Sequence, residues 1–565
     1  MNFFAELLDS SVRFQKQYAK YLLNRFQFLP CPNGRRTLDA LWVEPRGQTA
    51  ALANTPRVVI TGAAGTGKTT TLAYLAIANA HAMLTEPKPS VPIFFSGRDL
   101  VPQALPRITN LSRDLGLSNE LAAQCPRIFF PDVFNSQRAI VLIDDADLIP
   151  FDQLQIWLNE LKAARVIVSA QSPLADFVEY ALPGFRDNDI ERFARNWESE
   201  TVDPFMAALK TNNVPRLLTT NPMSLTLLAK VWKLDQPLPT HRADLFEAYA
   251  RGLLGESEET LKMLEGVALA IQRGRPATNE FVSKSRGFMR LAKNRTAEFT
   301  HDLWQAFFAA RALRESTDIT PIVEHLADAN WREVILFYAG LGDADELVER
   351  LIRRGNIGLA GHVSAHACDV RSDLRESVTQ ELMASAWDGK ADAIAALSAM
   401  QNEVAVDSFA AKLKDKDPAT RIRAAQVLGN LRLDRGIEYL LPQLRDVNPD
   451  VRDQVVAALG HSRTDRVIEP LLVALRGDSR VGVVDTRMRV AAAQALGEIA
   501  SDKALPALLV ELQIGEPELR PVAAESLKRI SSPLLVKPLA GIAQTGDDQA
   551  RQYANEILQV VDGQR

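Results

Sequence analysis

The sequence contains little cysteine: Cys31, Cys125 and Cys368 are the only three among 565 residues. Their wide separation argues against a disulfide framework and against the paired spacing of a cysteine metal site. It favours buried, reduced thiols, as in a cytosolic protein. No run in the sequence approaches the ~20 consecutive apolar residues that a membrane helix needs, so we expect no membrane partner.

The sequence also lacks a strong excess of charge of either sign. It has 65 Lys and Arg residues against 70 Asp and Glu residues, a formal net charge of -5, so we expect no general attraction to nucleic acid or to anionic membranes. The start, "MNFFAELLDSSVRFQKQYAKYLLNRF", carries Glu6 and lacks the charged segment followed by an apolar one that marks a secretory signal. These absences predict a cytoplasmic protein.

A glycine-rich segment is the most informative stretch that is present. In "VVITGAAGTGKTTTLAYL" (58–75), Gly62, Gly67, Lys68 and Thr69 match the pattern G-x-x-x-x-G-K-[ST] between a β-branched run and an apolar helical run. The alternative is a chance glycine-rich turn, but both flanks have the structure that a phosphate-binding loop requires. The predicted loop set for nucleotide binding is Gly62, Gly65, Thr66, Gly67, Lys68, Thr69 and Thr70.

Three further apolar runs predict strands of a parallel sheet. They are "VPIFFSGRDL" (91–100), "RAIVLIDDADLIP" (138–150) and "RVIVSAQSP" (165–173), separated by helical segments. Asp144 ends the second run, where a P-loop protein places a magnesium-binding aspartate, so Thr69 and Asp144 are the predicted metal ligands. As an alternative, Asp144, Asp145 and Asp147 would be helix N-cap residues, with Asp147 the strongest candidate for that role.

The order of six segments resembles a known family. These are "GAAGTGKTT", "VPIFFSGRDL", "AIVLIDDADLI", "VIVSAQSP", "NPMSLTLLAKVW" and "EFTHDLWQAFFAARAL", over about residues 15–315. Their order resembles the NACHT domains of signal-transducing STAND ATPases, relatives of the NLR immune receptors. The resemblance implies ATP or ADP with Mg²⁺ as ligands, and Asp147 as the residue that positions the attacking water. Asp145 is grouped with it as a candidate catalytic residue.

The resemblance also assigns two residues outside the core. Pro222 corresponds to a proline near the adenine, and His301 to a winged-helix histidine that reaches the β-phosphate in a closed, ADP-bound form. The alternative for His301 is a buried histidine satisfied by a backbone partner. Departures from the family are Asp145 in place of glycine, Leu148 in place of glutamate and Gln171 in place of arginine. They imply that nucleotide binding survives while hydrolysis is slow or absent.

The last third of the sequence is an internal repeat. Equivalent positions recur at intervals of 31, 37, 31 and 31 residues, at Gly429, Gly460, Gly497, Lys528 and Gln559. An arginine precedes each by eight residues, at Arg421, Arg452, Arg489, Arg520 and Arg551. The pattern resembles short HEAT repeats, whose helix pairs stack into a solenoid. We expect the arginines to be structural and to reach back to acidic residues of the preceding turn, and we expect a lengthened loop near 480–486.

The sequence therefore predicts a multidomain chain with an α/β P-loop NTPase core, a parallel sheet with flanking helices, followed by all-helical regions. The predicted regions are an N-terminal helical lead-in (1–50), the P-loop core (51–185), a small helical domain (186–240), a winged helix (241–318) and a HEAT solenoid (319–562), regular from about 385. A plain helical bundle is the alternative for the middle regions. The winged helix has no dense basic stripe, so we do not expect it to bind DNA.

These parts favour a signalling switch, in bacterial antiviral defence or another regulatory role. The solenoid would sense a protein ligand or client, the nucleotide would record the state, and the chain would form a nucleotide-dependent homo-oligomer. We expect a separate effector protein because no effector domain is visible in the sequence. The alternatives are an ATPase that remodels a bound client and a HEAT scaffold that nucleotide only stabilises.

Overall fold

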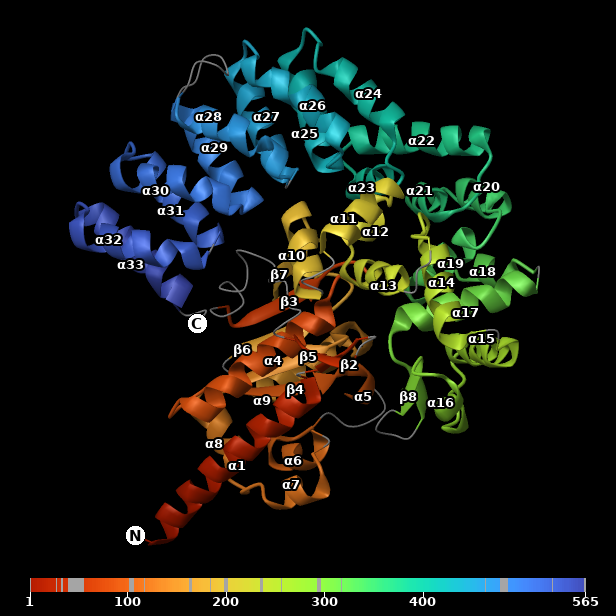
Figure 1. The fold of residues 1–565 in the computed structure, drawn as a ribbon, viewed down its shortest axis with the longest axis vertical. Coiled ribbons are helices and arrows are strands. Elements are labelled where there is room, and N and C mark those ends of the chain that lie inside the picture. Colours follow the sequence, from red (N-terminus) through yellow and green to blue (C-terminus); the bar gives the residue numbers. More distant parts are fainter. Residues whose placement is uncertain are drawn as a thin grey trace. The chain divides into compact units, whose positions relative to one another are not determined.

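The computed structural model describes residues 2–26, 28–31, 34–38, 55–100, 106–115, 117–161, 165–182, 184–197, 202–233, 237–255, 257–291, 296–316, 318–462, 464–477, 486–530 and 532–562. The chain divides into two compact units (Figure 1). The first comprises Met1–Pro45, Ala51–Leu238 and Leu291–Thr296, and the second Arg46–Ala50, Pro239–Arg290 and Ala297–Arg565. The finer division into five regions stays a prediction.

A parallel five-stranded sheet lies at the centre of the first unit. Its strands run in the order β4 (Val91–Ser96), β5 (Ala139–Asp144), β6 (Arg165–Ser169), β3 (Arg57–Thr61) and β7 (Val178–Ala181). Every neighbouring pair is parallel. Apolar, mostly β-branched runs form these strands because helices cover both faces of a parallel sheet. The sequence predicted strands at the start of 58–75 and within 91–100, 138–150 and 165–173, but it did not predict β7.

Helix α1 (Asn2–Phe26) belongs to the core of this unit. It packs along α4 (Lys68–Thr85), and Phe14, Tyr18 and Leu22 are each 1% exposed within the same hydrophobic cluster as the strands. The Tyr18 hydroxyl donates a hydrogen bond to the Pro92 carbonyl on β4 (2.9 Å). The predicted helical lead-in is therefore an integral layer of the sheet unit.

Short helices and one hairpin complete the first unit. The hairpin pairs β1 (Phe28–Cys31) with β2 (Gly34–Thr37) in antiparallel register. The helices around the sheet are α5 (Gly97–Leu100), η1 (Ile108–Asn110), α6 (Leu111–Asp114), α7 (Asn119–Ala123), α8 (Phe129–Asn135), η2 (Ala146–Leu148) and α9 (Phe151–Leu161). The helices after the sheet are α10 (Asp187–Trp197), α11 (Val202–Thr211), α12 (Arg216–Thr219) and α13 (Pro222–Trp232).

The second unit begins with three helices, a two-stranded sheet and a long helix. These elements are α14 (Arg242–Leu254), α15 (Glu258–Gln272), α16 (Glu280–Lys284), β8 (Met289–Leu291), β9 (Ala297–Phe299) and α17 (Asp302–Glu315). The assignment of this region to a winged helix stays a prediction. Phe246 on α14 lies 4.7 Å, between ring centroids, from both Trp304 and Phe337. Because Phe337 belongs to the next helix pair, this region shares its core with the solenoid.

The rest of the second unit is built from helices joined by short connections, with an isolated β-bridge between Asp343 and Asp369, and its helix pairs follow one another in an arc (Figure 1). The first helices are α18 (Thr320–Glu324), η3 (Ala329–Trp331), α19 (Arg332–Gly340), α20 (Asp345–Arg353), α21 (Ile357–His366), α22 (Ser372–Trp387), α23 (Ala391–Ala399), α24 (Glu403–Lys412) and α25 (Pro418–Leu431). Those that follow are α26 (Asp434–Leu440), η4 (Leu441–Arg445), α27 (Pro449–His461), η5 (Asp465–Val467), α28 (Ile468–Leu475), α29 (Thr486–Ile499), η7 (Asp502–Ala504), α30 (Leu505–Ile514), α31 (Leu519–Ile530), η8 (Pro533–Leu535), α32 (Val536–Thr545) and α33 (Asp548–Asp562).

The repeat glycines lie where consecutive helices of one layer meet. Helices α25, α27, α29, α31 and α33 pack successively. A Cβ atom on Gly429 would lie 2.6 Å from the Ala458 Cβ atom, and one on Gly460 would lie 2.8 Å from the Ala495 Cβ atom. Only glycine allows this helix separation, because real Cβ contacts are longer than these distances. The repeat found in the sequence therefore records a helix–helix contact.

The repeat arginines are structural, as predicted; Arg551 pairs with Asp548 of the preceding turn, as expected, but the acidic partners of three others lie in the following repeat. Arg421 forms a bidentate pair with Asp446 of the following turn (2.7 and 2.8 Å) and donates to the Asp415 carbonyl of the preceding turn (2.9 Å). Arg520 pairs with Asp547 of the following turn (2.6 Å). Arg489 likewise pairs with Glu511 and Glu516, so these three arginines link their own repeat to the next. Arg452 donates to the Asp446 carbonyl of the preceding turn (3.0 Å). Residues 478–485 of the predicted lengthened loop lie outside the described residues.

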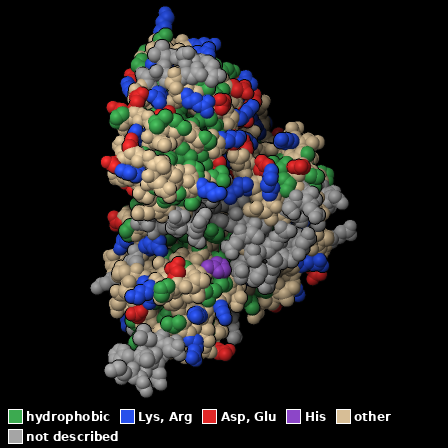
Figure 2. Space-filling model, turned by 60° about the vertical axis from the view of Figure 1, so that its left-hand side comes forward, with side chains coloured by type: hydrophobic (Ala, Val, Ile, Leu, Met, Phe, Trp, Pro, Cys, Tyr) green, Lys and Arg blue, Asp and Glu red, His purple; other side chains and the backbone are tan. Residues whose placement is uncertain are grey.

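Charge and hydropathy agree with the composition. Both signs of charge occur across the described parts of the face in Figure 2. Among the helices within the described ranges, none is long and apolar enough to cross a membrane.

Candidate phosphate-binding site

The glycine-rich loop joins β3 to the N-terminus of α4. Gly62, Gly65 and Gly67 have φ angles of 152°, 81° and 96°, a backbone conformation that side-chain-bearing residues rarely adopt. Gly67 is the N-cap of α4, and no side chain caps this 18-residue helix. Free backbone N–H groups and the helix dipole make such a loop complementary to an anion.

Lys68 turns back over this loop. Its Nζ atom donates to the Gly62 carbonyl (2.7 Å) and to the Ala63 carbonyl (3.3 Å). The ammonium group therefore lies within the curve of the loop, beside the backbone groups that would surround a phosphate. Thr66 and Thr70 occupy the same loop and the first turn of α4.

The predicted metal ligands are in direct contact. The Thr69 hydroxyl donates to Asp144 Oδ1 (3.1 Å), and the buried Ser169 hydroxyl donates to the same oxygen (2.6 Å). Ser169 also accepts a hydrogen bond from the backbone N–H of Asp145 (2.9 Å). Because β5 and β6 are parallel neighbours, Asp144 and Ser169 meet at the carboxyl edge of the sheet.

The Asp144 carboxylate is in an unfavourable electrostatic environment. Burial, with a further contribution from the Asp145 charge, raises its pKa to about 6, although hydrogen bonds from Ser169 and Thr69 and the charge of Arg98 act in the opposite direction. Asp144 is 8% exposed. A cation at this oxygen would relieve the penalty that burial places on the charged form.

Asp145 and Asp147 have different surroundings. Asp145 has a φ of 53°, which accounts for the glycine that the resembled family has there, and its carboxylate pairs with Arg98 (3.1 Å). Asp147 lies in the short helix η2 with an exposed side chain. Desolvation and the Asp145 charge raise the pKa of Asp147, whereas Lys68 lowers it, so Asp147 lies within the electrostatic reach of the loop lysine.

The N-terminus of α13 is bonded to the loop. The Asn221 side chain donates to the Ala64 carbonyl (2.9 Å), and the Met223 backbone N–H donates to the Gly65 carbonyl (3.2 Å). Asn221 also caps α13 by accepting from the Met223 and Ser224 N–H groups (3.1 Å each). Pro222, the first residue of α13, is half-buried beside this contact, and its place near an adenine stays a prediction.

His301 belongs to the second unit, where it is the N-cap of α17. Its ring Nδ1 accepts a hydrogen bond from the Leu303 backbone N–H (3.1 Å). This is the backbone partner that the alternative interpretation expected. Because Nδ1 is the acceptor, the proton of the neutral ring is assigned to Nε2. The phosphate role stays a prediction.

Three residues of this arrangement were missing from the predicted set: Arg98, Ser169 and Asn221. Ser169 ends the apolar run "RVIVS", and Asn221 stands before a helical proline, a pattern typical of an N-cap. Both signals were visible, but the contacts with Asp144 and Ala64 arise only in the folded chain. The resemblance to NACHT domains implies an arginine shortly after β6. This chain has Gln171 at that position, and its side chain is exposed.

The described residues contain no group of three or more His, Cys, Asp or Glu side chains that could hold a metal ion by themselves. Mg²⁺ typically takes one or two carboxylates and completes its shell with water and substrate phosphates. The Thr69 and Asp144 pair fits that smaller share, so these residues suit a magnesium–nucleotide complex better than a bare ion.

The comparisons with known proteins identify the repeats. A family model for HEAT repeats matches residues 375–459, 406–485, 437–509 and 484–559. No curated protein matches the chain. Two crystal structures of engineered proteins match parts of it: one is 21% identical and covers 34% of this chain and 92% of its own, and the other is 17% identical and covers 66% of this chain and 99% of its own. Both TM-scores are 0.24.

These scores are too low to support an argument about the fold. The resemblance to NACHT domains is not among these findings and stays a prediction. The match of the family model agrees with the stacked helix pairs, the glycine contacts and the arginine bridges described above. Residues 375–559 of this chain are HEAT repeats.

Proposed function

We propose that the chain is an ATP- and ADP-binding switch whose HEAT solenoid senses a protein partner. One observation carries the proposal: the glycine-rich loop, the Thr69–Asp144 pair (3.1 Å) and the N-terminus of α13 meet at one edge of the sheet. A loop of this kind with a hydroxyl and a carboxylate beside it is the arrangement that holds magnesium and the phosphates of a nucleotide.

The donor set favours a magnesium–nucleotide ligand. Lys68 would contact the outer phosphates, while Thr69 and Asp144 would hold the metal. The loop N–H groups would surround the phosphates, and bound MgATP would supply a γ-phosphoryl group for transfer to water. Strand order gives independent support, because β6 lies between β3 and β5 and so separates the loop strand from the Asp144 strand. The additional-strand class of P-loop proteins has this order.

The surroundings of the candidate catalytic residues favour slow hydrolysis. Asp145 is held by Arg98 and by a left-handed backbone conformation, so its carboxylate is engaged in the protein itself. Asp147 remains as the acidic residue near Lys68 that would orient a water molecule. Gln171 offers no charge to stabilise a developing negative charge. A slow ATPase suits a protein in which the bound nucleotide reports a state.

The contact between α13 and the loop suggests how nucleotide would change the shape of the chain. Filling the loop alters the carbonyls that Asn221 and Met223 bind, and α13 is the first element to sense that change. A shift from 1:99 to 99:1 between two states needs ~5.5 kcal/mol of preferential binding. A protein partner on the solenoid together with γ-phosphate contacts can supply it. We include nucleotide-dependent self-association, a separate effector protein and a role in antiviral defence or regulation in this proposal.

The test is the nucleotide that the purified full chain retains. We would extract it, identify it by chromatography, and repeat the assay on Lys68→Ala and on the control Lys88→Ala, an exposed lysine between α4 and β4. The proposal expects ADP in the wild type and in Lys88→Ala, and none in Lys68→Ala. Fast turnover without retained nucleotide would favour a remodelling ATPase. Equal nucleotide content in all three proteins would contradict a role of this loop in nucleotide binding.

A further inference from the structure

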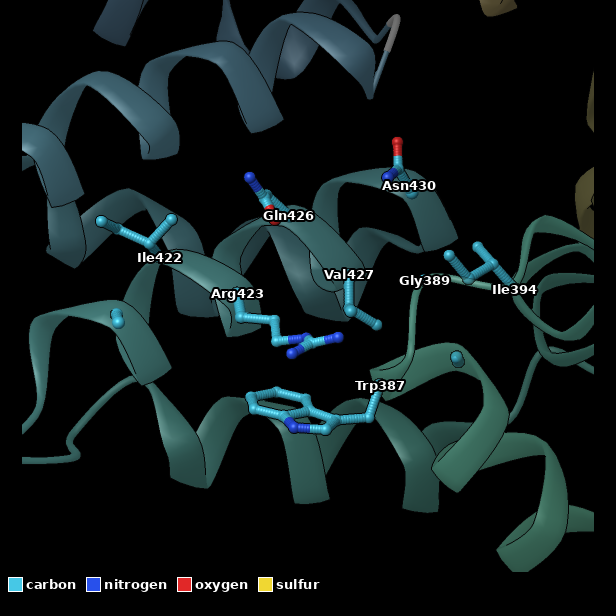
Figure 3. A pocket seen from close by; sticks show the side chains of 10 residues that line it. Trp387, Gly389, Ile394, Ile422, Arg423, Gln426, Val427 and Asn430 are labelled. Atoms are coloured by element: carbon cyan, nitrogen blue, oxygen red, sulfur yellow. The ribbon is translucent and has the colours of Figure 1, made fainter.

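A hollow opens between α22 and α25, where the regular repeats begin (Figure 3). Its volume is about 360 Å³, within the range of ligand pockets. Ile394, Ile422 and Val427 supply much of its apolar lining, and Asn430 and Gln426 add amide groups. This combination of apolar walls and a few polar groups is typical of a binding pocket.

Trp387, the last residue of α22, forms the floor of the hollow, with its ring beneath the Arg423 side chain in Figure 3. The ring also stacks on Phe409, with centroids 6.1 Å apart and planes at 9°. Phe409 is 1% exposed, so the indole rests on a buried partner that fixes its position. A ring held in this way gives the hollow a fixed apolar floor.

Two cations lie over this ring. The Arg423 guanidinium carbon is 5.5 Å from the ring centroid and the Lys412 ammonium nitrogen is 4.4 Å from it. Within the part of the chain that the structure describes, neither forms an ion pair. The residues that line the hollow include Arg423 and no Asp or Glu. The hollow therefore offers positive charge beside an apolar surface.

We propose that this hollow recognises a linear segment of a partner protein in which an Asp or Glu lies beside a large apolar side chain. The apolar side chain would fill the space between Ile394, Ile422 and Val427. The carboxylate would accept hydrogen bonds from the outer edge of Arg423, a charge-assisted contact stronger than a neutral one. A nucleic-acid base is disfavoured because Phe409, Arg423 and Lys412 already cover the indole ring that it would need for stacking.

This inference names the partner class of the proposed switch, but peptide binding can be measured apart from nucleotide. A phage-displayed library of random short peptides would be selected on the full chain. The consensus peptide, labelled with fluorescein, would then be titrated against wild type, Arg423→Gln, Trp387→Phe and the control Lys414→Gln. Lys414 is an exposed lysine that does not line the hollow. The same titration on Lys68→Ala separates a failure of this inference from a failure of nucleotide binding.

The expected consensus pairs Asp or Glu with Leu, Phe or Trp. Its Kd rises by about tenfold or more in Arg423→Gln and stays unchanged in Lys414→Gln and Lys68→Ala. Thermal melting checks that Arg423→Gln folds, as the exposure of this side chain predicts. Absence of an enriched peptide, or equal binding by Arg423→Gln, overturns the proposal. Binding of an oligothymidine that Arg423→Gln loses, without peptide binding, assigns the hollow to nucleic acid and overturns it as well.

Discussion

Each unit of the chain buries an aspartate side chain, and the two carboxylates are in opposite electrostatic states. Burial raises the pKa of Asp144 in the first unit to about 6. Burial also acts to raise the pKa of Asp446 in the second unit, but hydrogen bonds from Arg421 and the Asn448 backbone outweigh it, and the pKa lies below its usual value. The Asp446 side chain is 6% exposed.

The two carboxylates differ in their direct partners, which are a cation for Asp446 and hydroxyl groups for Asp144. We call the Asp446 contact complete and the Asp144 contact incomplete. The Arg421 guanidinium meets both oxygens of Asp446, so the solenoid carries the counter-charge within its own sequence. Asp144 receives hydrogen bonds from the hydroxyl groups of Thr69 and Ser169, and the charge of Arg98 lowers its pKa only slightly compared with the effect of burial. The Asp446 contact is complete on folding, whereas Asp144 keeps a charge that the proposed magnesium ion would neutralise.

Removing the cation from the completed site should give the largest effect. Arg421→Ala leaves the Asp446 carboxylate without its partner, and we expect the free energy of unfolding of the solenoid to fall by about 3 kcal/mol. Urea unfolding followed by circular dichroism measures it. The control is Arg487→Ala, because that side chain is 65% exposed beside Asp450 and Asp453 and should cost less than about 1 kcal/mol. Similar losses in the two variants would contradict the comparison.

Removing the charge of Asp144 should increase stability, the opposite of the effect at Arg421. In EDTA and without nucleotide, Asp144→Asn should stabilise the first unit by about 2 kcal/mol at neutral pH, because the charged form of Asp144 is disfavoured in the folded state. The folded pKa of about 6 exceeds the ordinary 3.8. The penalty is therefore fully present above pH 6 and disappears as the pH falls toward 3.8, so wild-type stability should rise over that window.

Calorimetry at several pH values measures both effects. The Asn variant should lack the contribution of Asp144 to the pH dependence, and MgATP should no longer raise its melting temperature. The difference in stability between the wild type and Asp144→Asn should shrink below pH 6. If this difference is the same below pH 6 as above it, Asp144 carries no such penalty.

Buried serines allow a smaller comparison of the same kind. Ser169→Ala removes a hydrogen bond to the charged Asp144 and should cost about 1.5 kcal/mol, while raising the pKa of Asp144 further. Ser526→Ala removes a bond to the neutral Ala493 carbonyl (2.8 Å) and should cost about 1 kcal/mol or less, with no change in nucleotide binding. Thermal melting with and without MgADP distinguishes the two. An equal effect of both variants on MgADP binding would argue against a special role for Ser169.

Two asparagine N-caps give the smallest effect and the sharpest contrast. Asn221→Ala and Asn448→Ala each remove a cap and should each cost about 1 kcal/mol of stability. Only Asn221 also bonds to the glycine-rich loop, so only its loss should weaken binding of a fluorescent ADP analogue. If Asn448→Ala weakens that binding to the same degree, the effect of Asn221 is one of general stability.

The sequence predicted the features that repeat or that satisfy strict backbone rules. The HEAT array was visible because Arg421, Arg452 and their equivalents recur with the glycines at fixed spacing. The strands were visible because parallel strands are apolar along their whole length. Strand β7 was missed because it is a short edge strand in which only Tyr180 is buried.

Contacts between distant segments could not be predicted. The burial of Tyr18 and Leu22 against the sheet follows from how α1 packs on α4, which the helical pattern alone does not fix. In the same way, the repeat arginines were correctly taken as structural, but the acidic partners of Arg421 and Arg520 lie in the following turn, which the stacking of the solenoid brings close. Spacing identifies a residue, whereas its partner depends on the packing.

The glycine at each helix contact has a consequence for how the array can change in length. The Gly429–Ala458 and Gly460–Ala495 contacts are chemically alike, so a duplicated or deleted repeat between them would create an interface that the chain already contains. Lys528 stands at the equivalent position between α31 and α33, where its side chain replaces the glycine of the earlier contacts. The solenoid can therefore lengthen or shorten most easily between the glycine contacts.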